Sequence, residues 1–201
     1  SKRLYLNYRS TSSIQRFCQA YRQLGSAIEQ GTEDTESDRA FREGPPVQLL
    51  IAENKDDLLP ALLDQIRFCI DQLDYEAENL AVLAPQEKML EAVDKKLTEL
   101  HIPSARLKDA DFSFEDSQGI RLSSLHSSKG LDFPVVLVYL PHLSHFSNFD
   151  ADVHDSQDHN LIYVACSRAM DYLVIASPEN SKFKAIADLH QLTELAEIQR
   201  V

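Results

Sequence analysis

The sequence is poor in glycine and cysteine and contains no long hydrophobic run. Its 201 residues include five glycines and three cysteines. Cys18, Cys69 and Cys166 lie far apart and form no CxxC pair, which fits a reducing compartment. No apolar stretch reaches the roughly 18 residues that a membrane span needs, and no signal-peptide pattern opens the chain. We therefore expect a cytoplasmic protein with no membrane partner.

Positive charge is also scarce. Lysine and arginine number 20 against 32 acidic residues, which gives a net charge of −12. This balance argues against a protein that coats nucleic acid non-specifically, because phosphate neutralisation needs cations. Residues 1–28 nevertheless contain five cations and no acid. Both a local basic face on an acidic body and ordinary solvated surface charge fit this distribution.

Short apolar runs rich in β-branched residues alternate with helical patterns. The runs cover 47–52, 80–84, 135–140 and 172–176. Because they are continuously apolar, they are typical of strands buried on both faces of a parallel sheet. Between them, 59–73 and 90–100 carry leucines at helical spacing, and Asp56 or Asp57 is placed to cap the first of these helices. This order predicts an α/β doubly wound fold.

Other segments lack these patterns. Residues 30–46 are polar, acidic and bounded by glycine and proline, which predicts a mobile loop. Residues 108–119 form a polar connection between short strands expected at 104–107 and 120–124. The stretch from Ser181 onward predicts a helix or a broken pair of helices.

Three segments place polar and cationic side chains at predicted strand ends. They are 6–11 (LNYRST), 120–133 (IRLSSLHSSKGLDF) and 161–169 (LIYVACSRA). Open α/β sheets bind ligands outside the carboxyl ends of their strands, so we expect a ligand site there.

These segments, in this order, resemble motifs IV, V and VI of the UvrD/Rep-type superfamily 1 DNA helicases. The family patterns are approximately NYRS, TxHxxKGLEF and YVAxTRA. Residues 80–104 also resemble the strand–helix–strand unit between motifs IV and V, so the resemblance covers nearly the whole chain. It implies that residues 1–201 form one RecA-like domain, a P-loop NTPase fold without its own P-loop. Such a domain is the second motor half of an ATP-dependent helicase or translocase.

The resemblance also implies a site for ATP with Mg²⁺ in the cleft between two RecA-like halves. The first half holds the phosphates and the metal, and this half supplies Arg9 and Arg168 to the γ-phosphate. A planar, permanently charged guanidinium can neutralise charge that develops on the transferring phosphoryl group. By motif position Tyr8 stacks on adenine, and Gly130 shapes the turn beside the nucleotide. Asp132 replaces a glutamate that hydrogen-bonds the ribose, and its shorter side chain withdraws that acceptor.

The same comparison implies contacts to single-stranded DNA and movement in the 3′-to-5′ direction. Ser124, His126 and Lys129 match positions of motif V beside the DNA backbone, where small donors and cations suit phosphate. RNA is a lesser alternative substrate. Ordinary structural roles also stay open for the site residues: a solvated Arg168, a core Tyr8, a turn His126 and a capping Asp132.

The sequence departs from the family pattern in several places. Residues 157–160 (QDHN) stand where members usually carry two acids and two basic residues, which weakens the expected coupling. Ser167 replaces a threonine, and only residues 108–119 remain where many members insert a large domain. The HxxH at 142–145, with His154 and His159 following, could suggest a metal site, but an HxxH in a loop with no cysteine or paired acid is a weak signal, so we expect no metal site.

No GxxxxGK[ST] sequence occurs, and no apolar run ends in the Asp-Glu pair that would hold magnesium. We therefore expect the isolated chain to be inactive and its partner to be a Walker-containing N-terminal half of the same protein. The start at Ser1, without a methionine, suggests an excised piece. A non-catalytic helicase-like interaction module is the alternative, which residues 157–160 and the net charge favour.

Overall fold

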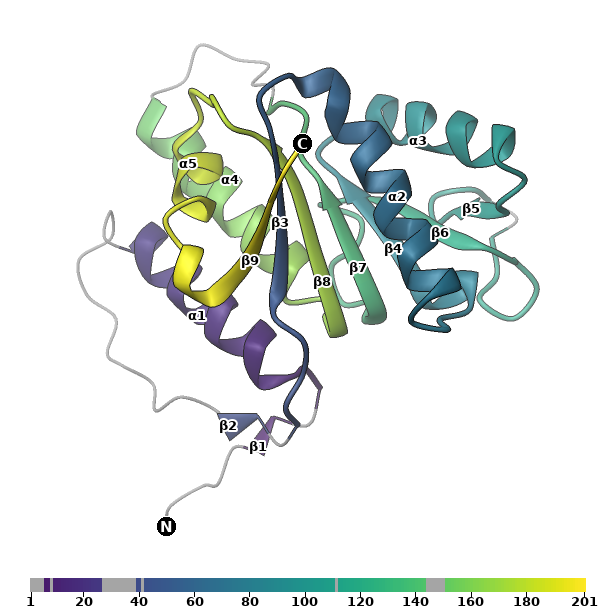
Figure 1. Cartoon of the computed structure of the whole chain (residues 1–201), viewed down its shortest axis with the longest axis horizontal. Helices are drawn as coiled ribbons and strands as arrows, with labels where there is room; N and C mark the ends of the chain where they lie inside the picture. Colours follow the sequence, from purple (N-terminus) through teal and green to yellow (C-terminus); the bar gives the residue numbers. More distant parts are fainter. Residues whose placement is uncertain (1–5, 8, 27–38, 41, 111, 144–150) are drawn as a thin grey trace.

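The computed structural model describes residues 6–7, 9–26, 39–40, 42–110, 112–143 and 151–201. Within these ranges, seven strands form one parallel sheet in the order β5-β6-β4-β7-β8-β3-β9. The strands are β3 (Val47–Ala52), β4 (Leu80–Ala84), β5 (Ser104–Arg106), β6 (Ile120–Ser124), β7 (Phe133–Tyr139), β8 (Ala169–Pro178) and β9 (Ala196–Arg200). A separate parallel pair, β1 (Leu6–Asn7) and β2 (Arg39–Ala40), lies beyond the amino ends of the main strands (Figure 1).

Helices cover both faces of the sheet (Figure 1). They are α1 (Ser12–Ser26), α2 (Leu58–Asp71), α3 (Glu87–Glu99), α4 (Ala151–Cys166) and α5 (Lys184–Leu189), with 3₁₀ turns at Lys55–Asp57, Ala77–Asn79 and Thr193–Leu195. Helices α1, α4 and α5 share one buried cluster with the sheet, and α2 and α3 share the other. In β3, Leu49 belongs to the first cluster and Leu50 to the second. Burial on both faces explains why the strands read as continuous apolar runs, and the doubly wound prediction is confirmed.

One local prediction is wrong, and another is confirmed only in part. Residues 196–200 form strand β9 instead of a helix; this edge strand pairs with β3, and its central Ile198 is 40% exposed. An exposed edge strand needs few apolar residues, so its polar sequence gives no strand signal. Asp57 occupies the N-cap position of helix α2, but its side chain makes no capping hydrogen bond there. A 3₁₀ turn precedes α2, and the Asn54 side chain accepts a hydrogen bond from Asp56 N at the start of that turn.

The described part of the connection at residues 108–119 is anchored to β6 by Arg121. The guanidinium of Arg121, in β6, lies 5.3 Å from the ring of Phe112 and 5.8 Å from that of Phe114. Arg121 Nη1 also donates a hydrogen bond of 2.7 Å to Ser117 O. Burial lowers the pKa of Arg121, which is 3% exposed. The connection is therefore polar in sequence but is fastened by cation–π contacts.

Most of the loop predicted at 30–46 lies outside the described residues. Its last part packs against the start of α1: Ser12 N donates to Arg42 O, and Ser13 Oγ donates to Gly44 O. A Cβ atom added to Gly44 would lie 2.4 Å from Thr11 Cγ2. Among the described helices, none combines the length and apolar character required to cross a membrane.

Candidate functional site

Arg9, Asp132 and Arg168 meet in one cluster, although they belong to three separate motifs. Arg9 Nε lies 3.0 Å from Asp132 Oδ2, and Arg168 Nη1 lies 3.4 Å from Asp132 Oδ1. The exposed fractions of the side chains are 53% for Arg9, 24% for Asp132 and 14% for Arg168. The two arginines therefore share the carboxylate of Asp132. Two side chains that bind one anion together must converge in this way.

The cluster lies at the amino edge of the sheet, whereas the expectation was a ligand site at the carboxyl ends of the strands; of the predicted site residues, Ser124 does end a strand, β6. Asp132 directly precedes β7 and Arg168 directly precedes β8, and these strands are parallel. Two hydrogen bonds to backbone carbonyl oxygens hold the motifs together there: Phe133 N donates to Arg168 O, and the side-chain Oγ of Ser10 donates to Ala169 O. The carboxyl-end rule concerns residues that follow strands, whereas two of these three side chains come before one.

Arg168 is held in place by the end of its own helix. Its Nε donates a 3.0 Å hydrogen bond to Val164 O, and its Nη2 donates one of 3.0 Å to Ser167 Oγ. Ser167 Oγ in turn donates to Val164 O at 2.8 Å. These bonds leave Nη1 facing Asp132. The serine that replaces the family threonine keeps this hydroxyl contact.

Arg42 braces the cluster, and no motif in the sequence singled it out. Its Nη2 lies within hydrogen-bond distance of two backbone carbonyl oxygens, at 3.2 Å from that of Arg9 and 3.3 Å from that of Met170. Its Nη1 forms an ion pair of 2.7 Å with Asp171 Oδ1. Arg42 thus joins the first motif to the start of β8. It belongs to the segment predicted as a loop, where one arginine among many polar residues gives no signal.

The residues predicted to contact DNA lie at the other end of the second motif. Ser124 ends β6 and is level with Ala84 at the carboxyl end of β4, whereas Val135 in β7 is level with Leu80 at the amino end of β4. Residues 125–132 therefore run from the carboxyl edge to the amino edge. Ser124 thus lies at the opposite edge from the arginine cluster, and His126 and Lys129 are exposed on the loop that connects the two edges.

The loop itself is internally bonded. Ser124 Oγ accepts a hydrogen bond from Ser127 N and donates one to Ser127 Oγ. Ser128 is fully buried and its Oγ donates to Leu125 O. Gly130 has a φ of 88°, and a Cβ there would meet nothing within 4 Å. Gly130 is therefore required for its backbone conformation and not for space.

Other predicted residues lie elsewhere or outside the description. Tyr8 lies outside the described residues. His159, from the altered segment 157–160, is buried and stacks on Tyr21 with ring centroids 3.8 Å apart. Its Nε2 lies 3.5 Å from Asp188 Oδ2, and burial lowers its pKa. The segment thus contributes a core residue where the family pattern has charged ones.

The structure gives no support to a metal site in the described part of the chain. No group of three or more His, Cys, Asp or Glu side chains is placed there to hold an ion. His142 is exposed, and the side chains of His145 and His154 are not described. The carboxylate of Asp132 is already paired with cations, so the cluster suits an anionic ligand better than a metal.

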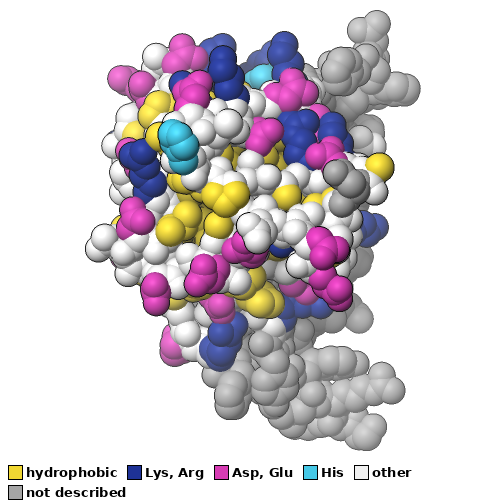
Figure 2. Space-filling view, turned by 90° about the vertical axis from the view of Figure 1, so that its right-hand side faces the viewer, with side chains coloured by type: hydrophobic (Ala, Val, Ile, Leu, Met, Phe, Trp, Pro, Cys, Tyr) yellow, Lys and Arg dark blue, Asp and Glu magenta, His cyan; other side chains and the backbone are white. Residues whose placement is uncertain are grey.

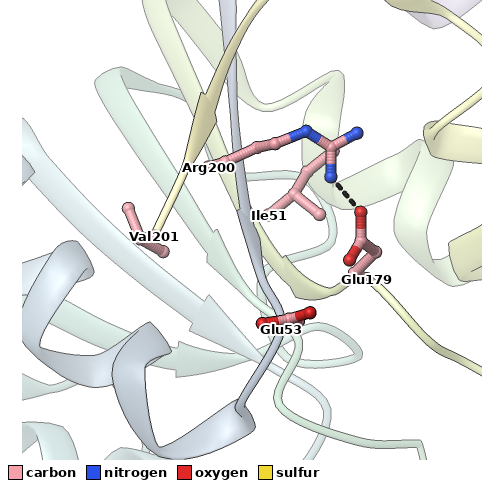
Figure 3. Close-up of a pocket in the computed structure, with 5 residues that line it drawn as sticks. All are labelled: Ile51, Glu53, Glu179, Arg200 and Val201. Carbon is pink, nitrogen blue, oxygen red and sulfur yellow. Dashed lines mark hydrogen bonds and ion pairs between the residues drawn. The ribbon is translucent and has the colours of Figure 1, made fainter.

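A separate pocket of about 380 Å³ lies at the carboxyl ends of β3 and β9 (Figure 3). It is lined by Ile51, Glu53, Glu179, Arg200 and Val201. Arg200 already forms an ion pair with Glu179, so the pocket offers an acidic lining and no available cationic group of its own. On another face, shown in Figure 2, acidic and basic side chains are interspersed around an apolar area.

The fold is a RecA-like α/β fold that matches the C-terminal domains of helicases. Residues 105–180 match the family model of the UvrD-like helicase C-terminal domain. This match covers the third motif and the second, and it confirms the recognition made from them. Residues 6–11 lie outside it. A comparison with curated proteins found no match.

One solved structure supports the fold, and two others are similar at lower TM-scores. The C-terminal domain of a possible DNA helicase from Lactobacillus plantarum WCFS1 superposes with a TM-score of 0.62 at 17% identity, over 96% of this chain and 98% of that one. The C-terminal domain of the DEAD-box protein Dbp5 gives 0.47 at 14% identity, over 78% and 89%. Domain 2 of the DEAD-box helicase Mss116p, bound to an RNA duplex, gives 0.49 at 14% identity, over 78% and 64%.

Proposed function

We propose that this chain is the second motor domain of an ATP-dependent DNA helicase or translocase. Arg9 and Arg168 then act on the terminal phosphate of ATP, which a neighbouring RecA-like half holds with Mg²⁺. The observation that carries the proposal is the convergence of the three motifs on one anionic group, with N–O distances of 3.0 and 3.4 Å. Folding alone does not require a surface carboxylate such as that of Asp132 to pair with two arginines from distant segments of the chain.

The geometry suits stabilisation of charge on a transferring phosphoryl group. Arg168 is mostly buried and fixed by two hydrogen bonds, so its remaining donor is oriented before a ligand arrives. An arginine supplied to phosphoryl transfer is worth about 10³ to 10⁵ in rate. When bound, Mg²⁺ neutralises phosphate charge from the opposite half. This chain orients the γ-phosphate and supplies the last positive charges only when the cleft closes.

We place the nucleic acid at the opposite edge, on Ser124, His126 and Lys129. Backbone contacts of this type are tolerant of sequence. The loop 125–132 connects this edge directly to Asp132, and that connection supports a mechanical link between phosphate and DNA. When the cleft between the two halves closes around ATP, the arginine cluster shifts, and the loop 125–132 transmits this shift to the bound DNA strand.

The test is ATP hydrolysis, measured for this chain alone and for the two-domain protein in which it is joined to its Walker-containing half. We expect no turnover from the chain alone and turnover stimulated by single-stranded DNA in the two-domain protein. Arg67→Ala is a suitable control, since Arg67 is exposed on α2, across the sheet. Steady hydrolysis by the isolated chain would contradict the proposal, and stimulation by RNA in place of DNA would change the substrate.

A second candidate, a helicase-like module that docks a protein partner, is supported by His159. This residue occupies the altered segment 157–160 and is buried in the core instead of facing the nucleotide cluster. The module predicts that the two-domain protein hydrolyses no ATP. It also predicts that changing Arg9 or Arg168 leaves partner binding intact.

A further inference from the structure

Asp132 stands where the family resemblance predicts a contact to ribose, but its carboxylate is used differently here. Oδ2 faces Arg9 and Oδ1 faces Arg168. Oδ1 is buried and accepts no hydrogen bond within the described residues, so its contact with Arg168 is electrostatic. Both oxygens are thus directed to the same guanidinium groups that the proposed function assigns to phosphate.

We propose that Asp132 acts as an internal substitute for the terminal phosphate and must be displaced when a nucleotide enters. This inference rests on the proposed function of Arg9 and Arg168. Without a ligand, two guanidinium groups close together repel each other, and the attraction of each to a carboxylate between them offsets that repulsion. Asp132 is therefore a positioning residue that holds the pair together until a phosphate replaces it.

The cluster is built for such an exchange. Arg168 is 14% exposed and fixed by its helix, whereas the side chain of Arg9 is 53% exposed. Arg9 is therefore the more accessible of the two to an incoming ligand, while hydrogen bonds hold Arg168 in place. A terminal phosphate carries more charge and more acceptor oxygens than one carboxylate, so it competes better for two guanidinium groups. This exchange therefore favours ligands that end in a polyphosphate. The sugar and the base of a nucleotide take no part in it.

The proposal is tested on this chain by calorimetric titration with inorganic tripolyphosphate at low ionic strength. We expect Asp132→Asn to bind about three- to tenfold more tightly than the unaltered chain, because each partly exposed ion pair is worth up to roughly fivefold in an equilibrium constant. Arg9→Ala and Arg168→Ala should each bind more weakly. The advantage of Asp132→Asn should shrink as salt is added.

Glu87→Gln is the matched control. Glu87 is also a carboxylate shared by two cations, at 3.8 Å from Arg106 and 2.9 Å from Lys108, and its side chain is 31% exposed. Its removal makes the same change in net charge and should alter binding by less than twofold. Equal gains from Asp132→Asn and Glu87→Gln would overturn the role of Asp132.

The outcomes distinguish a failure of the Asp132 inference from a failure of the proposed function on which it rests. If the arginine variants weaken binding but Asp132→Asn does not strengthen it, the anion site stands and the displacement of Asp132 is wrong. If none of the three variants changes binding, the proposed function fails as well. Arginine side-chain NMR gives a second measurement: the Nε–H signal of Arg9 should shift in Asp132→Asn and on addition of tripolyphosphate. An unmoved signal in both cases would overturn the exchange.

Discussion

The brace formed by Arg42 gives the most informative single perturbation. Arg42→Ala removes an ion pair of 2.7 Å to Asp171 and two contacts of 3.2 and 3.3 Å to backbone carbonyls of Arg9 and Met170. Arg42 is 44% exposed and Asp171 28%, so solvent screening limits the ion pair to about 1 kcal/mol at most. The long carbonyl contacts add about 0.5 kcal/mol each. We expect a loss of about 1 to 2 kcal/mol in the free energy of unfolding.

Function should suffer more than stability. Arg42 holds the backbone of Arg9, and a displacement of about 1 Å in a positioning group can lower a rate about 10²-fold. We therefore expect Arg42→Ala to reduce kcat of the two-domain protein by about 10- to 100-fold. Urea denaturation of the chain and ATPase kinetics of the two-domain protein measure the two effects.

Arg16→Ala controls for the loss of a cation on the same side of the domain. Arg16 pairs with Glu43 at 3.7 Å, and both side chains are highly exposed, at 62% and 88%. Its removal should change the free energy of unfolding by less than about 0.5 kcal/mol. If Arg42→Ala resembled Arg16→Ala in both stability and kcat, the bracing argument would be refuted.

Three further predictions concern stability and the fixing of Arg168. Gly119 and Gly130 both have a φ of 88°, but a Cβ on Gly119 would lie 2.1 Å from Pro103 O. Gly119→Ala should therefore destabilise the chain by about 1 to 3 kcal/mol more than Gly130→Ala. Equal melting temperatures of the two variants would contradict this. Burial lowers the pKa of His159 below its ordinary 6.5, so the unfolded state binds its proton first and stability should fall as pH drops below about 6.5. His159→Phe should flatten that dependence in denaturation measured across pH, and an unchanged slope would oppose the assignment. Ser167→Ala should lower kcat severalfold and Ser167→Thr should not, since only the alanine loses the hydroxyl that holds Arg168.

The sheet was largely predictable because its strands are buried on both faces. Strands 47–52 and 80–84 were predicted to the residue, since full burial leaves a continuous apolar run; strand 120–124 was predicted with the same bounds, although its sequence, IRLSS, is not such a run. Strand β9 was not, because an exposed edge strand carries little apolar sequence. A continuous hydrophobic run indicates burial, and it therefore predicts a strand only where that strand is fully buried.

The site was predictable only in part, for a different reason. The motifs identified Arg9, Asp132 and Arg168 as candidate site residues. Their spacing along the chain does not indicate which of these side chains form ion pairs with one another. That Asp132 faces Arg168 depends on the parallel register of β7 and β8, and that it also faces Arg9 depends on the contacts of Ser10 and Thr11 with the start of β8. Arg42 was missed because its partners are mainly backbone carbonyls, which leave no trace in the sequence.

The most direct test of the central claim is the effect of Arg168→Ala on the two steps of ATP turnover in the two-domain protein. We predict that kcat falls about 10³-fold or more while the dissociation constant for ATP changes only severalfold, because the guanidinium acts on charge that develops during transfer. Arg168→Lys should restore little, since an ammonium lacks the planar fork. A fall in kcat no greater than that of Arg67→Ala would contradict the account.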